Sequence, residues 1–172
     1  MRIGCIYLDE ACAEAIGRCK NLEYLAVYDP CTSEFVIAQA PWLKNLKTLS
    51  LADCSVDDIV QAASGSSKLE NLNVTPVVSP ATLTSLQKCK NLSFLQITSP
   101  GGRDKHSLGL DDDRIVEIGR LTQLKTLHLV NVKVFPRQLE ELQRKLPELK
   151  ILCSGREVGD KWFVPYKPSD IN

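Results

Sequence analysis

The sequence predicts an α/β protein of stacked coils, in which short parallel strands alternate with helices. The pattern L-x-x-L-x-L occupies residues 46–51 and returns along the chain. Between its copies, apolar residues recur at the i, i+3, i+4, i+7 spacing of an amphipathic helix. A fixed period of this kind is typical of a solenoid, because one unit alone cannot bury its apolar side. A strand, a helix and a returning parallel strand are joined by a right-handed crossover.

The repeat has seven copies, which set the period. The first apolar residues of the copies are Ile3, Leu22, Leu46, Leu69, Leu92, Leu124 and Leu149. The intervals between them are 19, 24, 23, 23, 32 and 25 residues. Two further apolar positions follow in each copy, namely Ile6 and Leu8, Leu25 and Val27, Leu49 and Leu51, Leu72 and Val74, Leu95 and Ile97, and Leu127 and Leu129. The seventh copy keeps Leu149 and Leu152 and has Ser154 at the third position.

On these copies the chain resembles the leucine-rich repeat family, over about nine tenths of its length. The resemblance implies a right-handed leucine-rich repeat solenoid, with a curved parallel sheet of about seven strands on the concave side and helices on the convex side. We expect the solenoid over residues 1–154, an insertion loop at about 99–110, and a C-terminal cap or tail over 155–172.

One position departs from the family. The third residue after the last core apolar residue is often Asn or Cys in the family, where its side chain bonds the backbone of the turn. Here the corresponding residues are Ala11, Pro30, Cys54, Val77, Pro100 and Val132. Because only Cys54 fits, we expect these turns to satisfy their backbone groups with water.

Each segment between strands predicts a helix with an apolar face. The inward residues are Cys12, Ala15, Ile16 and Cys19 in the first; Val56, Ile59, Val60 and Ala63 in the third; Leu83, Leu86 and Cys89 in the fourth; Ile115, Ile118 and Leu121 in the next; and Leu139, Leu142 and Leu146 in the last. Helix starts are indicated by Ser55 as an N-cap, by Pro80, by Asp111-Asp112-Asp113 and by Pro136. The segment before Pro41 is the weakest helical pattern.

The composition of the chain argues against nucleic acid and membranes as partners. The 172 residues include 21 basic and 21 acidic ones, so the net charge is zero. A neutral chain has no strong overall field to attract nucleic acid or an anionic membrane, and we expect neither as a partner. The sequence has no apolar run of about 18 residues and no signal-peptide pattern. Its seven cysteines contain no C-x-x-C pair, so we expect reduced structural thiols, no metal and a cytoplasmic location.

Residues between the core positions point to the face of the sheet away from the helices, which we call the open face. Its aromatic residues, Tyr7, Tyr24, Tyr28 and Phe94, are the contact anchors that an interface would use. The polar residues expected beside them are Ser50, Asn71, Asn73, Gln96 and His128. The resemblance implies protein binding on this concave side. The alternative is a solvated face that binds nothing.

Other candidate sites have weaker patterns. His106 and His128 lie far apart without a matching nucleophile, so they predict no catalytic set. The acidic run at 111–113 lacks the spacing of a calcium loop, and acids at a helix N-terminus explain it without metal. Residues 101–103, Gly-Gly-Arg, lack the Lys-Ser/Thr of a phosphate loop.

The sequence therefore predicts a non-enzymatic module, without cofactor, that binds a protein or peptide on the concave sheet face. It would serve as an adaptor, an inhibitor or a recognition subunit. The insertion would contribute Arg103, Asp104, Lys105 and His106 to the contact surface. One alternative is a structural segment that self-associates through its uncapped N-terminal end. Another is an enzyme whose site lies in the 99–110 loop.

Overall fold

The computed structural model describes residues 2–5, 10–28, 41–52, 56–75, 78–100 and 109–154. Tyr7, the centre of the insertion with Arg103, Asp104, Lys105 and His106, and the segment 155–172 lie outside the described residues. The same holds for the weak helix predicted before Pro41.

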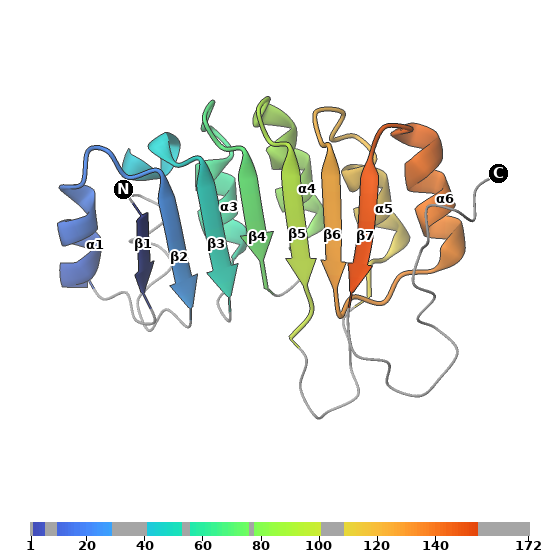
Figure 1. The fold of residues 1–172 in the computed structure, drawn as a ribbon, viewed down its shortest axis with the longest axis horizontal. Coiled ribbons are helices and arrows are strands. Elements are labelled where there is room, and N and C mark those ends of the chain that lie inside the picture. Colours follow the sequence, from blue (N-terminus) through green and yellow to red (C-terminus); the bar gives the residue numbers. More distant parts are fainter. Residues whose placement is uncertain are drawn as a thin grey trace.

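The described residues form one parallel sheet with helices packed on one of its faces (Figure 1). The strands are β1 (Arg2–Cys5), β2 (Tyr24–Tyr28), β3 (Thr48–Ala52), β4 (Asn71–Val74), β5 (Phe94–Thr98), β6 (Thr126–Val130) and β7 (Lys150–Ser154), and they lie side by side in chain order. The helices are α1 (Glu10–Gly17), α3 (Asp57–Ala63), α4 (Pro80–Ser85), α5 (Asp112–Ile118) and α6 (Pro136–Lys145), with 3-10 turns η1 (Pro41–Asn45) and η2 (Leu86–Lys88). An α/β chain with one parallel sheet is confirmed.

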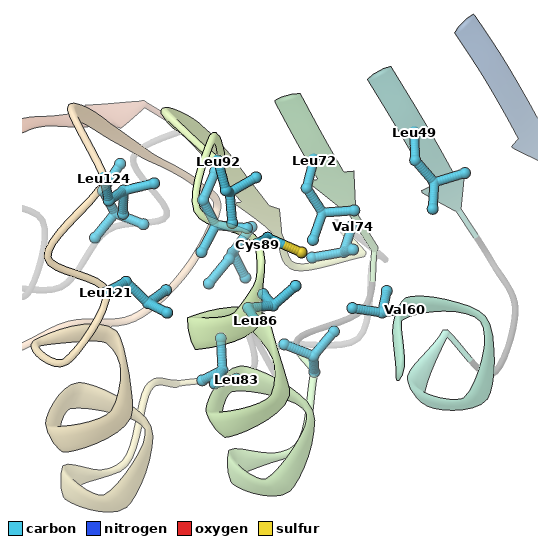
Figure 2. Packing of buried hydrophobic residues seen from close by; sticks show 14 of the residues in the cluster. Leu49, Val60, Leu72, Val74, Leu83, Leu86, Cys89, Leu92, Leu121 and Leu124 are labelled. Atoms are coloured by element: carbon cyan, nitrogen blue, oxygen red, sulfur yellow. The ribbon is translucent and has the colours of Figure 1, made fainter. Parts of the chain in front are cut away.

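Strand register stacks equivalent leucines into one buried column. Leu25, Leu49, Leu72, Leu95 and Leu127 are paired successively, and each is 0% exposed. Figure 2 shows Leu49 and Leu72 on their strands, above side chains from the helices. A fully buried aliphatic side chain contributes roughly 1.5–3 kcal/mol, so this shared seam is the main source of stability.

The predicted inward faces of the helices are largely confirmed. The buried residues include Ile59, Val60, Leu83, Leu86, Ile115, Ile118, Leu139 and Leu142. In α1, Ile16 is buried, whereas Ala15 is exposed and was wrongly placed inward. Val56 precedes α3 and makes no side-chain cap bond, and the predicted N-cap, Ser55, lies outside the described residues. Ser79 and Asp111 cap α4 and α5 through the backbone N–H of Thr82 and Arg114.

The first strand corrects the predicted register by three residues. Arg2 pairs with Tyr24, and Ile3 pairs with Leu25. The repeat pattern had instead aligned Cys5 with Tyr24 and Ile6 with Leu25. Four residues then separate β1 from α1, as four separate β3 from α3. The predicted strand, running to residue 8, would have left almost no chain for that turn. The first interval of 19 residues, shorter than all the others, was the signal of this error.

The observed register of the last strand differs from the predicted one by one residue. Ile151, not Leu152, pairs with Leu127 and is 4% exposed. Leu152 pairs with His128 on the open face and is 37% exposed. The seventh copy lacks one residue between its first two core positions. Consequently Ser154 lies beside Val130 on the open face rather than at the third core position.

Polar side chains satisfy backbone carbonyls where helices return to strands. Asn91 Nδ2 donates to Ser67 O, and Gln123 Nε2 donates to Leu86 O and Cys89 O at 3.2 and 3.1 Å. Ser66 Oγ donates to Lys44 O at 2.8 Å. These hydrogen bonds lie at the edge of the sheet where strands begin. The Asn or Cys of the family pattern would lie at the opposite edge, where strands end.

Three cysteine side chains are described, and they differ in how deeply they are buried. Cys89 is 0% exposed among Leu72, Leu86 and Leu92, and its Sγ lies 3.2 Å from Ser64 O (Figure 2). Burial raises the pKa of this thiol to about 11, so the group stays neutral at physiological pH. Cys19 and Cys153 are half-buried against the core, and none of the three described thiols forms a disulfide.

Candidate interaction face

Strand alternation places three columns of side chains on the open face. Because every second residue of a strand points to the same side, the residues flanking each buried leucine lie outward. The first column is Arg2, Tyr24, Thr48, Asn71, Phe94, Thr126 and Lys150. The second column includes Ala26, Ser50, Asn73, Gln96, His128 and Leu152. The third includes Tyr28, Ala52, Thr98, Val130 and Ser154.

A row of hydrogen bonds crosses the last three strands. His128 Nδ1 lies 3.2 Å from Gln96 Oε1, and its Nε2 lies 2.9 Å from Ser154 Oγ. Gln96 Nε2 donates to Thr98 Oγ1 at 3.3 Å. Because the Gln96 Oε1 atom can only accept, His128 Nδ1 donates to it, whereas the Ser154 hydroxyl can donate to Nε2 or accept from it. The row therefore links three strands through paired polar side chains.

The Ser154–His128 pair has the contact of a nucleophile and its base, so its chemistry matters. In serine hydrolases a carboxylate holds the histidine and stabilises the imidazolium. Here Gln96 offers an uncharged carbonyl in that place. The amide holds the imidazole ring in place but supplies no negative charge to stabilise an imidazolium. Sequence reasoning missed this partner of His128 because it placed Ser154 in the core.

Two asparagines lie in the middle of the face. Asn71 Nδ2 donates to Thr48 Oγ1 at 3.4 Å, which links β4 to β3. Asn73 is half-buried between Ser50 and Gln96 in the second column. Its Oδ1 is buried and has no hydrogen-bond partner within the described part of the chain. A buried acceptor without a donor costs roughly 1–3 kcal/mol, so this amide is a local cost at the centre of the face.

The three aromatic anchors that the structure describes, Tyr24, Tyr28 and Phe94, do not form one patch. Tyr24 lies in β2 and Phe94 in β5, with Thr48 and Asn71 between them in the same column. Tyr28 is 43% exposed at the other end of β2. The Arg2 guanidinium carbon lies 5.3 Å from the centroid of the Tyr24 ring, a cation–π contact that the register error had hidden. The centre of the face is accordingly polar.

The base of the insertion is held by backbone bonds. Ser99 N donates to Val130 O at 2.9 Å, and Leu110 N donates to Lys133 O at 3.0 Å. Gly109 forms a parallel bridge with Lys133, and Leu110 is buried. Both ends of the 99–110 loop are therefore fixed at the edge where β5 and β6 end.

The acidic run at 111–113 has protein partners. Asp111 caps α5 and pairs with Arg114. Asp112 accepts from Gln138 Nε2 at 2.8 Å and pairs with Arg137 at 3.2 Å. Among the described residues no group of three or more His, Cys, Asp or Glu side chains is placed to hold a metal ion. These contacts account for the acids as helix caps and links between α5 and α6.

Comparisons with known proteins give a fold neighbour only. No protein-family model and no curated protein matches the chain. Among solved structures, an internalin from Listeria monocytogenes is similar, at 17% identity over 83% of this chain and 52% of that chain, with a TM-score of 0.37. This chain thus spans about half the length of that internalin. The architecture is therefore established from the register and burial of the chain's own strands.

Proposed function

We propose that the chain is a leucine-rich repeat module that binds a protein or peptide partner on the open face of its sheet. Its finer architecture in this proposal is a right-handed, curved solenoid of seven coils with the open face on the concave side. The module acts without catalysis, as an adaptor, an inhibitor or a recognition subunit. The buried thiol of Cys89 supports the accompanying assignment to the cytoplasm, since such a thiol is suited to a reducing compartment.

The preorganised polar row is the observation that carries this proposal. Gln96, His128 and Ser154 are held by one another on three strands of a packed sheet. Their positions are fixed before a partner arrives, which lowers the entropy cost of binding. A partner that presents polar groups to the exposed Ser154 hydroxyl and the half-buried His128 ring would bind this row.

The test compares two double variants by affinity capture from the native cell extract. Ser50→Arg/Asn73→Arg places two bulky charges on the open face. Ala15→Arg/Ala81→Arg adds the same two charges at exposed positions of α1 and α4 and is the matched control. We expect a partner that the wild type and the helix variant retain and the open-face variant loses. Retention by the open-face variant together with loss by the helix variant would refute the proposal.

A second candidate function is self-association through the ends of the sheet. β1 and β7 are the outer strands of the described sheet, and an outer strand offers unpaired backbone groups to another copy. In our proposal residues 155–172, with their aromatic segment at 162–166, cap the end of the sheet at β7. Removal of 155–172 should then produce concentration-dependent oligomers in sedimentation, whereas an unchanged monomer would exclude the cap.

None of the described helices is long and apolar enough to cross a bilayer.

A further inference from the structure

Charge is unevenly distributed between the two edges of the sheet, although the net charge is zero. The edge where helices return to strands lies uppermost in Figure 1. Its exposed lysines are Lys20, Lys44, Lys47, Lys68, Lys88, Lys90 and Lys125. The described acids on these connections are Glu23, Glu70 and Glu148. The opposite edge carries Asp57, Asp58, Asp111, Asp112 and Asp113 at the starts of helices. The upper edge is therefore basic.

Within the basic edge, three successive connections enclose a hollow. It has a volume of about 400 Å³ and lies where β2, β3 and β4 begin. Its lining residues are Lys20, Asn21, Leu22, Glu23, Asn45, Lys47 and Lys68. Lysine side chains from three different coils thus line one hollow, with the amide of Asn45 beside them.

The hollow already binds one carboxylate, that of Glu23. Lys47 Nζ lies 2.7 Å from Glu23 Oε1. The hydrogen bond and charge of Lys47 hold the pKa of Glu23 below its usual range, and Lys68 lowers it further. Lys68 Nζ donates to the neutral Asn45 Oδ1 at 3.2 Å. Neither Lys20 nor Lys68 has an ion pair within the described ranges. Room for a second carboxylate therefore exists beside the first.

The lysines on this edge also repel one another. Adjacent strands are about 4.8 Å apart, which is less than the Debye length of about 8 Å at physiological ionic strength. A row of like charges at this spacing lowers stability unless anions neutralise it. Most of these lysines follow the helices rather than lie in their last turns, so favourable contact with helix C-termini does not account for them.

We propose that this hollow binds a carboxylate side chain from an acidic peptide segment, a run of Asp or Glu in a protein partner. The site is separate from the open face and independent of the function proposed above. Carboxylate fits because Glu23 demonstrates that geometry within the chain. Nucleic acid fits less well, because Glu23 and Glu70 interrupt the positive edge and the described residues that line the hollow include no aromatic side chain for base stacking.

The test measures binding of a fluorescent hexaglutamate peptide by anisotropy. Lys20→Gln/Lys68→Gln should lower the affinity about tenfold. Glu23→Gln should raise it about threefold, because Lys47 loses its internal partner and becomes available. Arg144→Gln/Lys150→Gln removes the same charge at exposed positions far from the hollow and should leave the affinity unchanged. The gain by Glu23→Gln cannot arise from a misfolded protein.

Three results would overturn the proposal. The first is equal loss in the hollow variant and the Arg144/Lys150 control, which would show attraction by overall charge alone. The second is weaker binding in Glu23→Gln at an unchanged melting temperature. The third is equal or tighter binding of single-stranded DNA of matched charge, with the same response to the variants. Ser50→Arg/Asn73→Arg, with its charges on the open face, should still bind the peptide in the hollow, which separates this site from the open-face function.

Discussion

The middle and the C-terminal end of the chain differ in how completely they bury the same repeat. In β3 to β5 the core residues Leu49, Leu72 and Leu95 are 0% exposed, with a strand on either side. At the C-terminal end Leu139 and Leu146 are 9% and 7% exposed, and Leu152 faces outward at 37%. A coil with two neighbours has both its sides covered, whereas a terminal coil has one. The contribution of each leucine to stability therefore depends on its position along the stack.

The largest effect is expected in the middle. Leu72→Ala should lower the free energy of unfolding by about 2–5 kcal/mol, because it removes a buried side chain and leaves a cavity that rigid neighbours cannot fill. Urea denaturation followed by circular dichroism measures this loss. A loss under about 1 kcal/mol would show that the central seam is not packed as described.

The same change at the end should cost less. Ile151→Ala should lower the free energy of unfolding by about 2 kcal/mol, near the lower limit for such substitutions, because the outer side of the last coil can relax. The measurement is again urea denaturation, alongside Leu72→Ala. Equal losses at the two positions would remove the difference between middle and end.

The buried thiol predicts a pH dependence in the middle of the chain. The pKa of Cys89 is raised from 9.0 to about 11, so burial favours the neutral thiol. Its contribution to stability is complete below pH 9 and is lost as the pH rises toward 11, at no more than about 1.4 kcal/mol per pH unit. Urea denaturation from pH 8 to 10.5 should show a steeper decline for the wild type than for Cys89→Ala. Parallel declines would contradict the assignment.

A smaller effect is expected at the turn that follows β6. Asn131 has a φ of 54°, in the left-handed region, and its N–H donates to Ser154 O at 2.8 Å. Asn131→Ala should lower the free energy of unfolding by about 1 kcal/mol more than Asn131→Gly does, because glycine adopts this backbone conformation without strain. A glycine variant as unstable as the alanine variant would show that the Asn side chain matters more than the backbone conformation.

The smallest effect is expected one residue from the largest. Asn73→Ala should lower the free energy of unfolding by less than about 0.5 kcal/mol, because the side chain lies on the open face and its removal relieves the unsatisfied burial of Oδ1. Calorimetry beside Leu72→Ala provides the comparison. A loss above about 2 kcal/mol would place Asn73 in the core and overturn the register of β4.

The middle of the fold could be predicted from the sequence, and the ends could not. From Leu22 to Leu129 each copy has neighbours that repeat its spacing, so the alternation identified the buried and open positions. At β1 the apolar alternation allowed either Ile3 or Ile6 to be aligned with Leu25. Only the length of chain needed between β1 and α1 selects Ile3. At β7 one missing residue moved Ile151 inward and Ser154 outward.

The candidate sites show the same division. The positions of Ser50, Asn73, Gln96 and His128 on the open face followed from strand alternation, but the contact of His128 with Ser154 depended on the register of β7. The basic hollow escaped prediction for a different reason. Its lysines lie on three separate connections, more than 20 residues apart in sequence, and only stacking of the coils brings Lys20, Lys47 and Lys68 together.

Distances between spin labels on β3 and β7 test the stacked parallel arrangement most directly. Four strand spacings separate Thr48 from Lys150 and Ala52 from Ser154, so both pairs should lie about 19 Å apart. The crossed pairs, Thr48 with Ser154 and Ala52 with Lys150, should both be longer, at about 23 Å. Short crossed distances with long direct ones would mean that the two strands run in opposite directions, which would contradict the stacked coils.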